Sequence, residues 1–177
     1  PVRESILSIL PLVDEFVVAL GDCEEDDDTE ELLTSIGSEK IRVIHTTWDT
    51  VAFPRNAEYA RQTDIAMEHC TGDWVFYIQS DEVIHEEDHA EILSACKTHL
   101  DTPEIEGFLF NYHHFWGDYD HCHNSHALYP KEIRLVRRRP DIHSWKDAQS
   151  FRVIPNYTGT WTDYFNKEGT RKLNVIG

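Results

Sequence analysis

Residues 71–82 read TGDWVFYIQSDE, and they contain the most strand-like run of the chain. The run at 74–78 is entirely aromatic and aliphatic, a composition that favours a buried strand. A Thr-Gly-Asp turn precedes it, and two adjacent carboxylates, Asp81 and Glu82, follow it closely. The stretch therefore predicts a central strand with acidic side chains beyond its carboxyl end.

The residues before and after this strand alternate between helical and strand-like patterns. Pro11 ends one predicted helix, and Gly37 ends the next. The predicted elements are helix 2–10, strand 16–20, helix 29–36, strand 41–44, helix 55–70, strand 74–78 and helix 86–99. Strands that alternate with helices in this way predict a mostly parallel sheet that is covered by helices on both faces.

The second half of the chain has a different pattern. Two predicted strands, 107–112 and 132–136, are separated by a polar, histidine-rich loop instead of a helix. This pattern predicts a mixed sheet with an elaborated second half. The 177 residues suffice for one domain. We place that domain at 1–154 and expect residues 155–177 to form a weakly patterned C-terminal tail.

The chain is strongly acidic, with 16 Lys and Arg against 33 Asp and Glu and a formal net charge of −17. Such a charge repels nucleic acid and anionic membranes. No apolar run approaches the roughly 20 residues that span a bilayer, and the four cysteines form no C-x-x-C pair. We therefore expect a cytoplasmic protein with free thiols, no transmembrane segment and no nucleic-acid partner. The start at Pro1, directly before a helix, indicates that upstream residues were removed or not included.

Acidic residues gather first in the loop at 21–29, directly after a predicted strand. In open α/β sheets, ligands bind beyond the carboxyl ends of the strands. Gly21 permits a tight turn there, and Asp22 or Asp28 could accept hydrogen bonds from a nucleoside base or ribose. The alternative is a solvated acidic loop in which Asp28 or Thr29 caps the following helix.

Asp81 and Glu82 form the second acidic place. An unpaired charge at the end of a buried strand is unfavourable, and a divalent cation would offset that penalty. Mg²⁺ or Mn²⁺ takes oxygen ligands, needs only one or two protein carboxylates and completes its shell with substrate phosphates. The alternative is an exposed strand end whose acids cap the helix at 86–99.

The stretch 71–82 resembles the G-D-W/Y-hydrophobic-D-x-D-D/E signature of family 2 glycosyltransferases. The order of strands, helices and acidic loop around it supports the resemblance, which covers roughly residues 1–152. It implies the GT-A fold, a Rossmann-type αβα sandwich around a central, mostly parallel mixed sheet. It also implies a nucleotide-diphospho-sugar donor such as a UDP- or GDP-sugar, and Mn²⁺ or Mg²⁺ as the cofactor.

Individual residues take roles from this resemblance. Asp81 matches the last acid of the family's D-x-D-like motif, which binds the metal that holds the donor diphosphate, and Ser80 beside it is expected to contact the donor. Gln79 departs from the family, because many members carry an Asp there. Asp22, Asp28 and Asp64 correspond to positions near the nucleotide.

The segment 144–152, SWKDAQSFR, resembles the acceptor side of the family's site, where the catalytic carboxylate lies. Inverting sugar transfer needs a general base that removes the proton of the acceptor hydroxyl. Asp147 is the predicted base, and the acceptor is a glycan or a lipid-linked sugar of the cell envelope that could bring the protein to a membrane. The alternative for Asp147 is a helix N-terminal acid that Lys146 or Arg152 neutralises.

Two further clusters fit the family less closely. Five of the eleven histidines lie between His113 and His126, at a density that could bind zinc or copper. A loop that lines the acceptor cleft, with Trp116 and Tyr112 stacking on sugars, is the alternative, and so is a plain polar loop. The basic residues Arg134, Arg137, Arg138 and Arg139 could reach a diphosphate, or could belong to a basic edge strand.

The resemblance ends at both termini of the sequence. Family members usually begin with a strand that contributes to the nucleotide pocket, whereas this chain begins at the helix that follows it. A metal-binding histidine near the C-terminus is not recognisable after Asn174. Two hypotheses result: a metal-dependent glycosyltransferase, and a non-catalytic protein on the same scaffold that binds a nucleotide sugar or holds a metal in its histidine loop.

Overall fold

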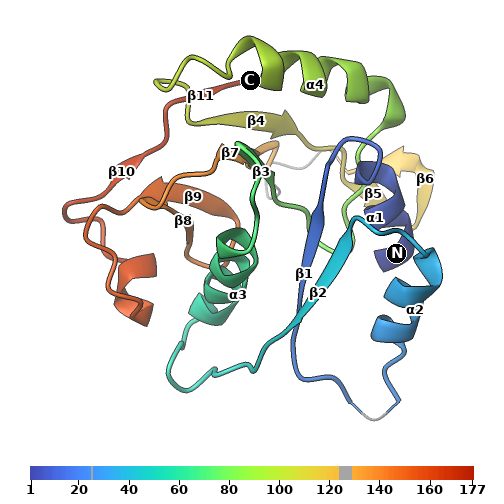
Figure 1. The fold of residues 1–177 in the computed structure, drawn as a ribbon, viewed down its shortest axis with the longest axis horizontal. Helices are drawn as coiled ribbons and strands as arrows, with labels where there is room; N and C mark the ends of the chain where they lie inside the picture. Colours follow the sequence, from blue (N-terminus) through green and yellow to red (C-terminus); the bar gives the residue numbers. More distant parts are fainter. Residues whose placement is uncertain (25, 124–128) are drawn as a thin grey trace.

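The computed structural model describes residues 1–24, 26–123 and 129–177, and it has a mixed α/β fold (Figure 1). The first half of the chain consists of α1 (Val2–Ile9), β1 (Phe16–Leu20), α2 (Thr29–Ile36), β2 (Ile41–His45), α3 (Ala57–Glu68), β3 (Trp74–Phe76), η1 (Glu86–Asp88) and α4 (His89–Thr98). Each helix and strand predicted from the pattern of this half is present, with small shifts at the ends.

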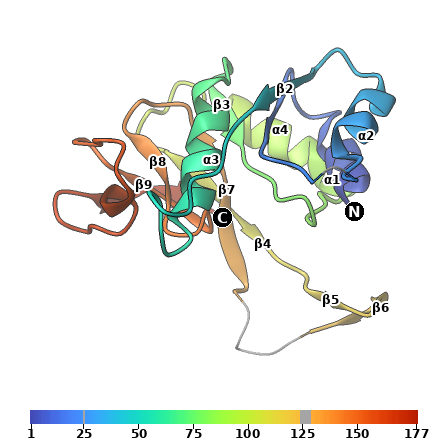
Figure 2. The same ribbon diagram turned by 90° about the horizontal axis from the view of Figure 1, so that it is seen from below.

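The second half is built mainly of strands. It contains β4 (Gly107–Asn111), β5 (Phe115–Trp116), β6 (Asp118–Cys122), β7 (Lys131–Arg137), β8 (Ile142–Trp145), β9 (Ser150–Val153), η2 (Trp161–Tyr164), β10 (Arg171–Lys172) and β11 (Val175–Ile176). The hairpin β5–β6 projects from the body of the molecule (Figure 2).

Local signals explain the order of the first elements. Gly37 ends α2 in the left-handed conformation at φ 66°, which glycine adopts without strain. β1 then pairs with β2 in parallel, from Phe16 opposite Ile41 to Leu20 opposite His45. The β1–α2–β2 segment is therefore a βαβ unit, as the alternation of its sequence predicts.

The strands in the described residues form four sheets rather than one. β1 and β2 form a parallel pair, and the largest sheet has the order β11-β4-β7-β3. In that sheet β7 runs antiparallel to both β3 and β4, and β11 runs parallel to β4. The continuous, mostly parallel sheet expected from the alternation is thus divided, because β1 and β3 do not pair with each other.

Residues 155–177, whose composition predicts no element, pack onto the rest of the domain. β10 pairs with β9, and β11 pairs with β4. Tyr164 is completely buried, and Leu173 belongs to the core cluster that contains Val136 and Phe151. This segment therefore completes two sheets, although its individual pairings are too short to leave a periodic pattern.

The basic cluster does not lie on an edge strand, because β7 is the neighbour of both β3 and β4. Arg134 is 2% exposed and pairs with Glu82. Arg137 donates to four backbone carbonyls around the end of α4, those of His99, Leu100, Thr102 and Ile105. The interpretation as a basic edge strand is therefore wrong. Arg134 and Arg137 instead bind a carboxylate and backbone carbonyls of neighbouring segments.

Glu106 lies between three donors near the end of the chain. Arg139 Nη1 and Arg171 Nη2 lie 2.5 and 2.6 Å from Glu106 Oε1, and the Asn174 N–H donates to Oε2 at 3.0 Å. Hydrogen bonds from Arg171, the Asn174 N–H and the nearby arginine charges lower the pKa of Glu106 from 4.5 to about 2. The carboxylate is therefore stabilised in the folded state.

We expect the Glu106 site to make stability depend on pH. A lowered folded-state pKa contributes stability that is complete above pH 4.5 and is lost as the pH falls towards 2. The shift corresponds to about 3 kcal/mol. Urea unfolding from pH 6 to pH 3 should therefore show a stability loss that is about 2 kcal/mol larger in the parent chain than in Glu106→Gln. Equal losses in the two chains would contradict this assignment.

Within the described residues, no helix is both long enough and apolar enough to cross a membrane.

Candidate functional site

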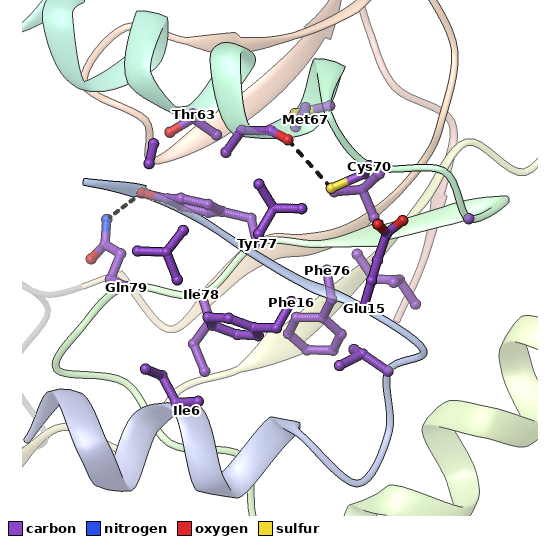
Figure 3. Close-up of a pocket in the computed structure, with 18 of the residues that line it drawn as sticks. Ile6, Glu15, Phe16, Thr63, Met67, Cys70, Phe76, Tyr77, Ile78 and Gln79 are labelled. Carbon is purple, nitrogen blue, oxygen red and sulfur yellow. Dashed lines mark hydrogen bonds between the residues drawn. The ribbon is translucent and has the colours of Figure 1, made fainter. Parts of the chain in front are cut away.

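A cavity of about 1150 Å³ lies between β1 and β3. Figure 3 shows Ile6 reaching into it from α1, and Thr63 and Met67 reaching into it from the opposite side on α3. The cavity follows the length of the two strands, from residues 14–15 and 71–73 at their amino ends to residues 79–81 at the carboxyl end of β3. The carboxyl end is where the sequence places the acidic residues.

Ser80 and Asp81 lie at this carboxyl end, and both line the cavity. Both are exposed. Within the described part of the chain, the Asp81 carboxylate makes no hydrogen bond or ion pair. A carboxylate that faces a cavity without a protein partner suits a divalent cation, which would share its shell with phosphate oxygens.

Glu82 does not line the cavity, and both of its carboxylate oxygens have hydrogen-bond partners in the protein. Its two carboxylate oxygens accept from Arg134 at 2.8 and 3.0 Å, and Tyr112 donates to Oε1 at 2.7 Å. Burial tends to raise the pKa of Glu82, but the hydrogen bonds and charge of Arg134 hold it below its ordinary value. Glu82 therefore does not cap η1 or α4, and Asp81 is left as the unpaired acid of the two.

Asp147 lines the same cavity from the turn that joins β8 to β9. Its two neighbours, Lys146 and Ala148, have φ values of 61° and 63°, a backbone conformation that residues other than glycine rarely adopt. Trp145 and Ala148 are buried and hold the turn in place, while Asp147 is half-buried. The residue is thus presented by a strained, well-anchored turn and not by a helix N-terminus.

Asp22 is exposed beyond β1, next to an aromatic pair that sequence reasoning missed. Its Oδ2 accepts from the Trp48 N–H at 3.2 Å, and the Trp48 and Tyr59 rings meet edge to face with centroids 5.2 Å apart. Both rings line the cavity. A Cβ on Gly21 would lie 2.0 Å from Trp48 Nε1, so glycine is needed for the indole to lie there. The sequence signal that could have identified Trp48 as a site residue is its position just after the strand β2.

The structure does not bring Asp28 or Asp64 to the cavity lining. Asp28 precedes α2 without a side-chain capping bond, and Asp27 instead accepts from the Thr29 N–H at 2.8 Å. Asp64 is 4% exposed, and its carboxylate accepts from the Ser144 N–H at 2.7 Å and contacts His143 Nδ1 at 3.0 Å. Burial raises the pKa of Asp64 despite these bonds.

No family model matches the sequence, and neither does any curated protein.

The histidine-rich region lies on the hairpin β5–β6 and its flanks. His121 Nδ1 lies 2.6 Å from Asp118 Oδ1, and His114 Nε2 lies 2.8 Å from the Tyr129 carbonyl oxygen. In the described ranges, no group of three or more His, Cys, Asp or Glu side chains is placed to hold a metal ion. His126 lies outside the described residues, so metal binding by the whole loop remains a prediction.

The cavity lining therefore combines three chemical features. Asp81 supplies a carboxylate free of protein partners, Asp147 supplies a second carboxylate on a rigid turn, and Trp48 with Tyr59 supplies an aromatic wall beside Asp22. One or two carboxylates fit the needs of Mg²⁺ or Mn²⁺ when a substrate brings phosphate oxygens. The arrangement thus offers oxygen ligands for a divalent cation beside an aromatic surface.

Proposed function

We propose that this chain carries a metal-dependent glycosyltransferase site of the family 2, GT-A type. The donor is a UDP- or GDP-sugar, the acceptor is a glycan or a lipid-linked sugar, and transfer inverts the anomeric centre. The observation that carries the proposal is that Asp81 and Asp147 line the same cavity, although 66 residues separate them in the sequence. The signature-like stretch 71–82 supports it.

Each residue has a defined task in this proposal. Asp81, with Ser80 beside it, would hold Mn²⁺ or Mg²⁺, and the bound metal would supply positive charge to stabilise the departing diphosphate. Trp48 and Tyr59 offer a face on which the nucleoside base can stack, and Asp22 can accept from base or ribose. Asp147 removes the proton of the acceptor hydroxyl as its oxygen attacks the anomeric carbon.

The net charge of −17 opposes the approach of an anionic donor unless the local field at its binding site is inverted. A divalent cation produces this inversion, because it is the largest charge in such a site. We therefore expect donor binding to depend strictly on the metal.

Calorimetric titration with UDP, and separately with GDP, in the presence and absence of Mn²⁺ tests the donor site. We expect one nucleotide to bind only with Mn²⁺, and Asp81→Ala to weaken this binding at least about tenfold. Asp73→Ala is the matched control, because Asp73 is an exposed aspartate at the opposite end of the same cavity. Nucleotide binding that is equally tight without Mn²⁺ and in Asp81→Ala would contradict the proposal. The absence of binding with both nucleotides would also contradict it.

A further inference from the structure

Asp64 lies where three elements meet beside the turn that carries Asp147. It belongs to α3, which packs against β8 and η2 (Figure 1). Its carboxylate is 4% exposed and does not line the cavity, so a contact with the nucleotide does not account for its surroundings. We propose that Asp64 is a positioning residue that fixes the turn of Asp147. This inference rests on the proposed function, because it gives Asp64 a task through the general base.

The strand that leads into the turn, β8, has one edge without a strand partner. Its other edge pairs with β9, and β8 ends the sheet order β10-β9-β8 among the described strands. On the open edge, the Ser144 N–H donates to Asp64 Oδ1 at 2.7 Å, and the Lys146 N–H donates to the Tyr164 carbonyl at 3.1 Å. Asp64 and Tyr164 therefore supply the acceptors that a neighbouring strand would otherwise provide.

Asp64 also holds Tyr164, the second of these acceptors. The Tyr164 hydroxyl donates to Asp64 Oδ2 at 3.2 Å, and Tyr164 is completely buried. The Tyr157 hydroxyl oxygen lies 2.6 Å from that of Tyr164, so the two tyrosines are fixed together. One carboxylate thus holds the Ser144 N–H directly and the Lys146 N–H through Tyr164. Both backbone groups on this edge of the strand before Asp147 depend on it.

His143 completes the surroundings of Asp64. Its Nδ1 lies 3.0 Å from Asp64 Oδ2, and its ring stacks on that of Tyr157 with centroids 3.8 Å apart. Its Nε2 is buried and has no hydrogen-bond partner among the described residues. A proton on Nε2 would be a buried donor without an acceptor, so we assign the proton to Nδ1, which donates to Asp64. His143 therefore fixes the direction of the carboxylate.

The backbone of the turn explains why it needs this support. Lys146 and Ala148 both have positive φ, and such a conformation persists only where the surrounding structure holds it. After the turn, the Gln149 carbonyl accepts from Arg134 Nη1 at 3.4 Å, whereas Asp64 provides the contacts before it. Without Asp64 the turn would relax and carry Asp147 with it. A displacement of about 1 Å at a reacting group can lower a rate about 100-fold.

Amide hydrogen exchange in Asp64→Asn tests the structural step without any substrate. Asparagine keeps the size of the side chain, but its Nδ2 is a donor and cannot accept from His143 and Tyr164. We expect the Ser144 and Lys146 amides to exchange at least about tenfold faster than in the parent chain. The amides of His143 and Trp145 are the internal control, because they face β9 on the other edge of β8. Unchanged exchange, or an equal acceleration of all four amides, would overturn the proposal.

Donor hydrolysis measures the catalytic consequence. The release of nucleotide from UDP-glucose and from GDP-mannose is followed with Mn²⁺ present and water as the acceptor. We expect Asp64→Asn to lower kcat at least about tenfold and to keep the KM for the donor within about threefold. Phe108→Leu is the matched control, because Phe108 is buried in a core cluster that includes neither β8 nor α3, and it does not line the cavity. It should lower the melting temperature and leave kcat unchanged, and equal kcat losses in the two variants would overturn the proposal.

Two substitutions of His143 separate its hydrogen bond from its packing. His143→Asn can place an amide N–H close to where Nδ1 donates, whereas His143→Leu has no donor. We expect His143→Asn to keep kcat within about threefold and His143→Leu to lose about tenfold. Equal losses in both would overturn the task given to His143. If the parent chain releases no nucleotide from either donor, the proposed function fails instead, and the exchange of the Ser144 and Lys146 amides still decides whether Asp64 holds the turn.

Discussion

Replacing Arg134 with alanine is expected to lower the free energy of unfolding by about 3–5 kcal/mol. Arg134 is 2% exposed, and it neutralises a Glu82 side chain that is only 12% exposed. Its guanidinium also lies between two rings, 5.2 Å from the centroid of Tyr77 and 5.3 Å from that of Tyr112. The truncation would leave the Glu82 carboxylate buried without its partner, which is the main source of the expected loss.

Urea unfolding followed by tryptophan fluorescence measures this loss. The double variant Arg134→Met, Glu82→Gln is the informative control, because it removes both charges and keeps most of the volume. Replacement of both members of a buried ion pair by neutral groups of similar size is often nearly neutral. We therefore expect the double variant to recover most of the stability. If it is as unstable as Arg134→Ala, the loss arises from packing around the two tyrosines and not from a stranded carboxylate.

The Arg134–Glu82 pair also bears on the candidate site. Asp81 and Glu82 are adjacent in sequence, yet only Glu82 has a cationic partner within the described residues. Arg134 therefore removes one of two negative charges at the end of β3 and fixes the backbone from which Asp81 projects. In the proposed enzyme, Arg134 is a positioning residue: its loss would disturb the direction of Asp81 as well as the stability of the fold.

The helices and strands of the first half could be predicted because their signals are local. Pro11 and Gly37 end helices by their own backbone properties, and the apolar runs at Phe16–Leu20 and Ile41–His45 have the length of buried strands. The division of the sheet could not be predicted in the same way. It depends on whether β1 and β3 pair, and neither run encodes its partner.

The long-range polar contacts were equally hidden in the sequence. Arg134 lies 52 residues from Glu82, and Asp64 lies 79 residues from His143. A charge run such as 134–139 therefore predicts solvated or ligand-binding arginines, whereas the topology surrounds them with carbonyls and carboxylates. Asp81 was predictable as a candidate because it follows a predicted strand, and Asp147 because the segment 144–152 resembles the acceptor side of the family's site. Trp48 was missed because an aromatic residue after a short strand has no distinctive spacing.

Asp147→Asn is expected to lower kcat by about 10²- to 10⁴-fold if Asp147 is the general base of sugar transfer. Asparagine keeps the size of the side chain and its polar character, so the turn with Lys146 and Ala148 at positive φ should persist. The affinity for the nucleotide and Mn²⁺ should stay within about threefold, because Asp147 acts on the acceptor and Asp81 on the donor. Nucleotide release from the sugar donor, with candidate acceptors, gives kcat, and calorimetry gives the affinity.

Glu132→Gln is the matched control for this experiment. Glu132 is close enough for Asp147 to contribute to the raised pKa of Glu132, after the larger effect of burial, but Glu132 does not line the cavity. We expect this variant to keep kcat within about threefold. The comparison of kcat between Asp147→Asn and Glu132→Gln then distinguishes a general base from a structural carboxylate. Parallel losses of kcat in both variants, or a loss of nucleotide affinity in Asp147→Asn, would mean that Asp147 shapes the electrostatics of the site instead of removing the acceptor proton.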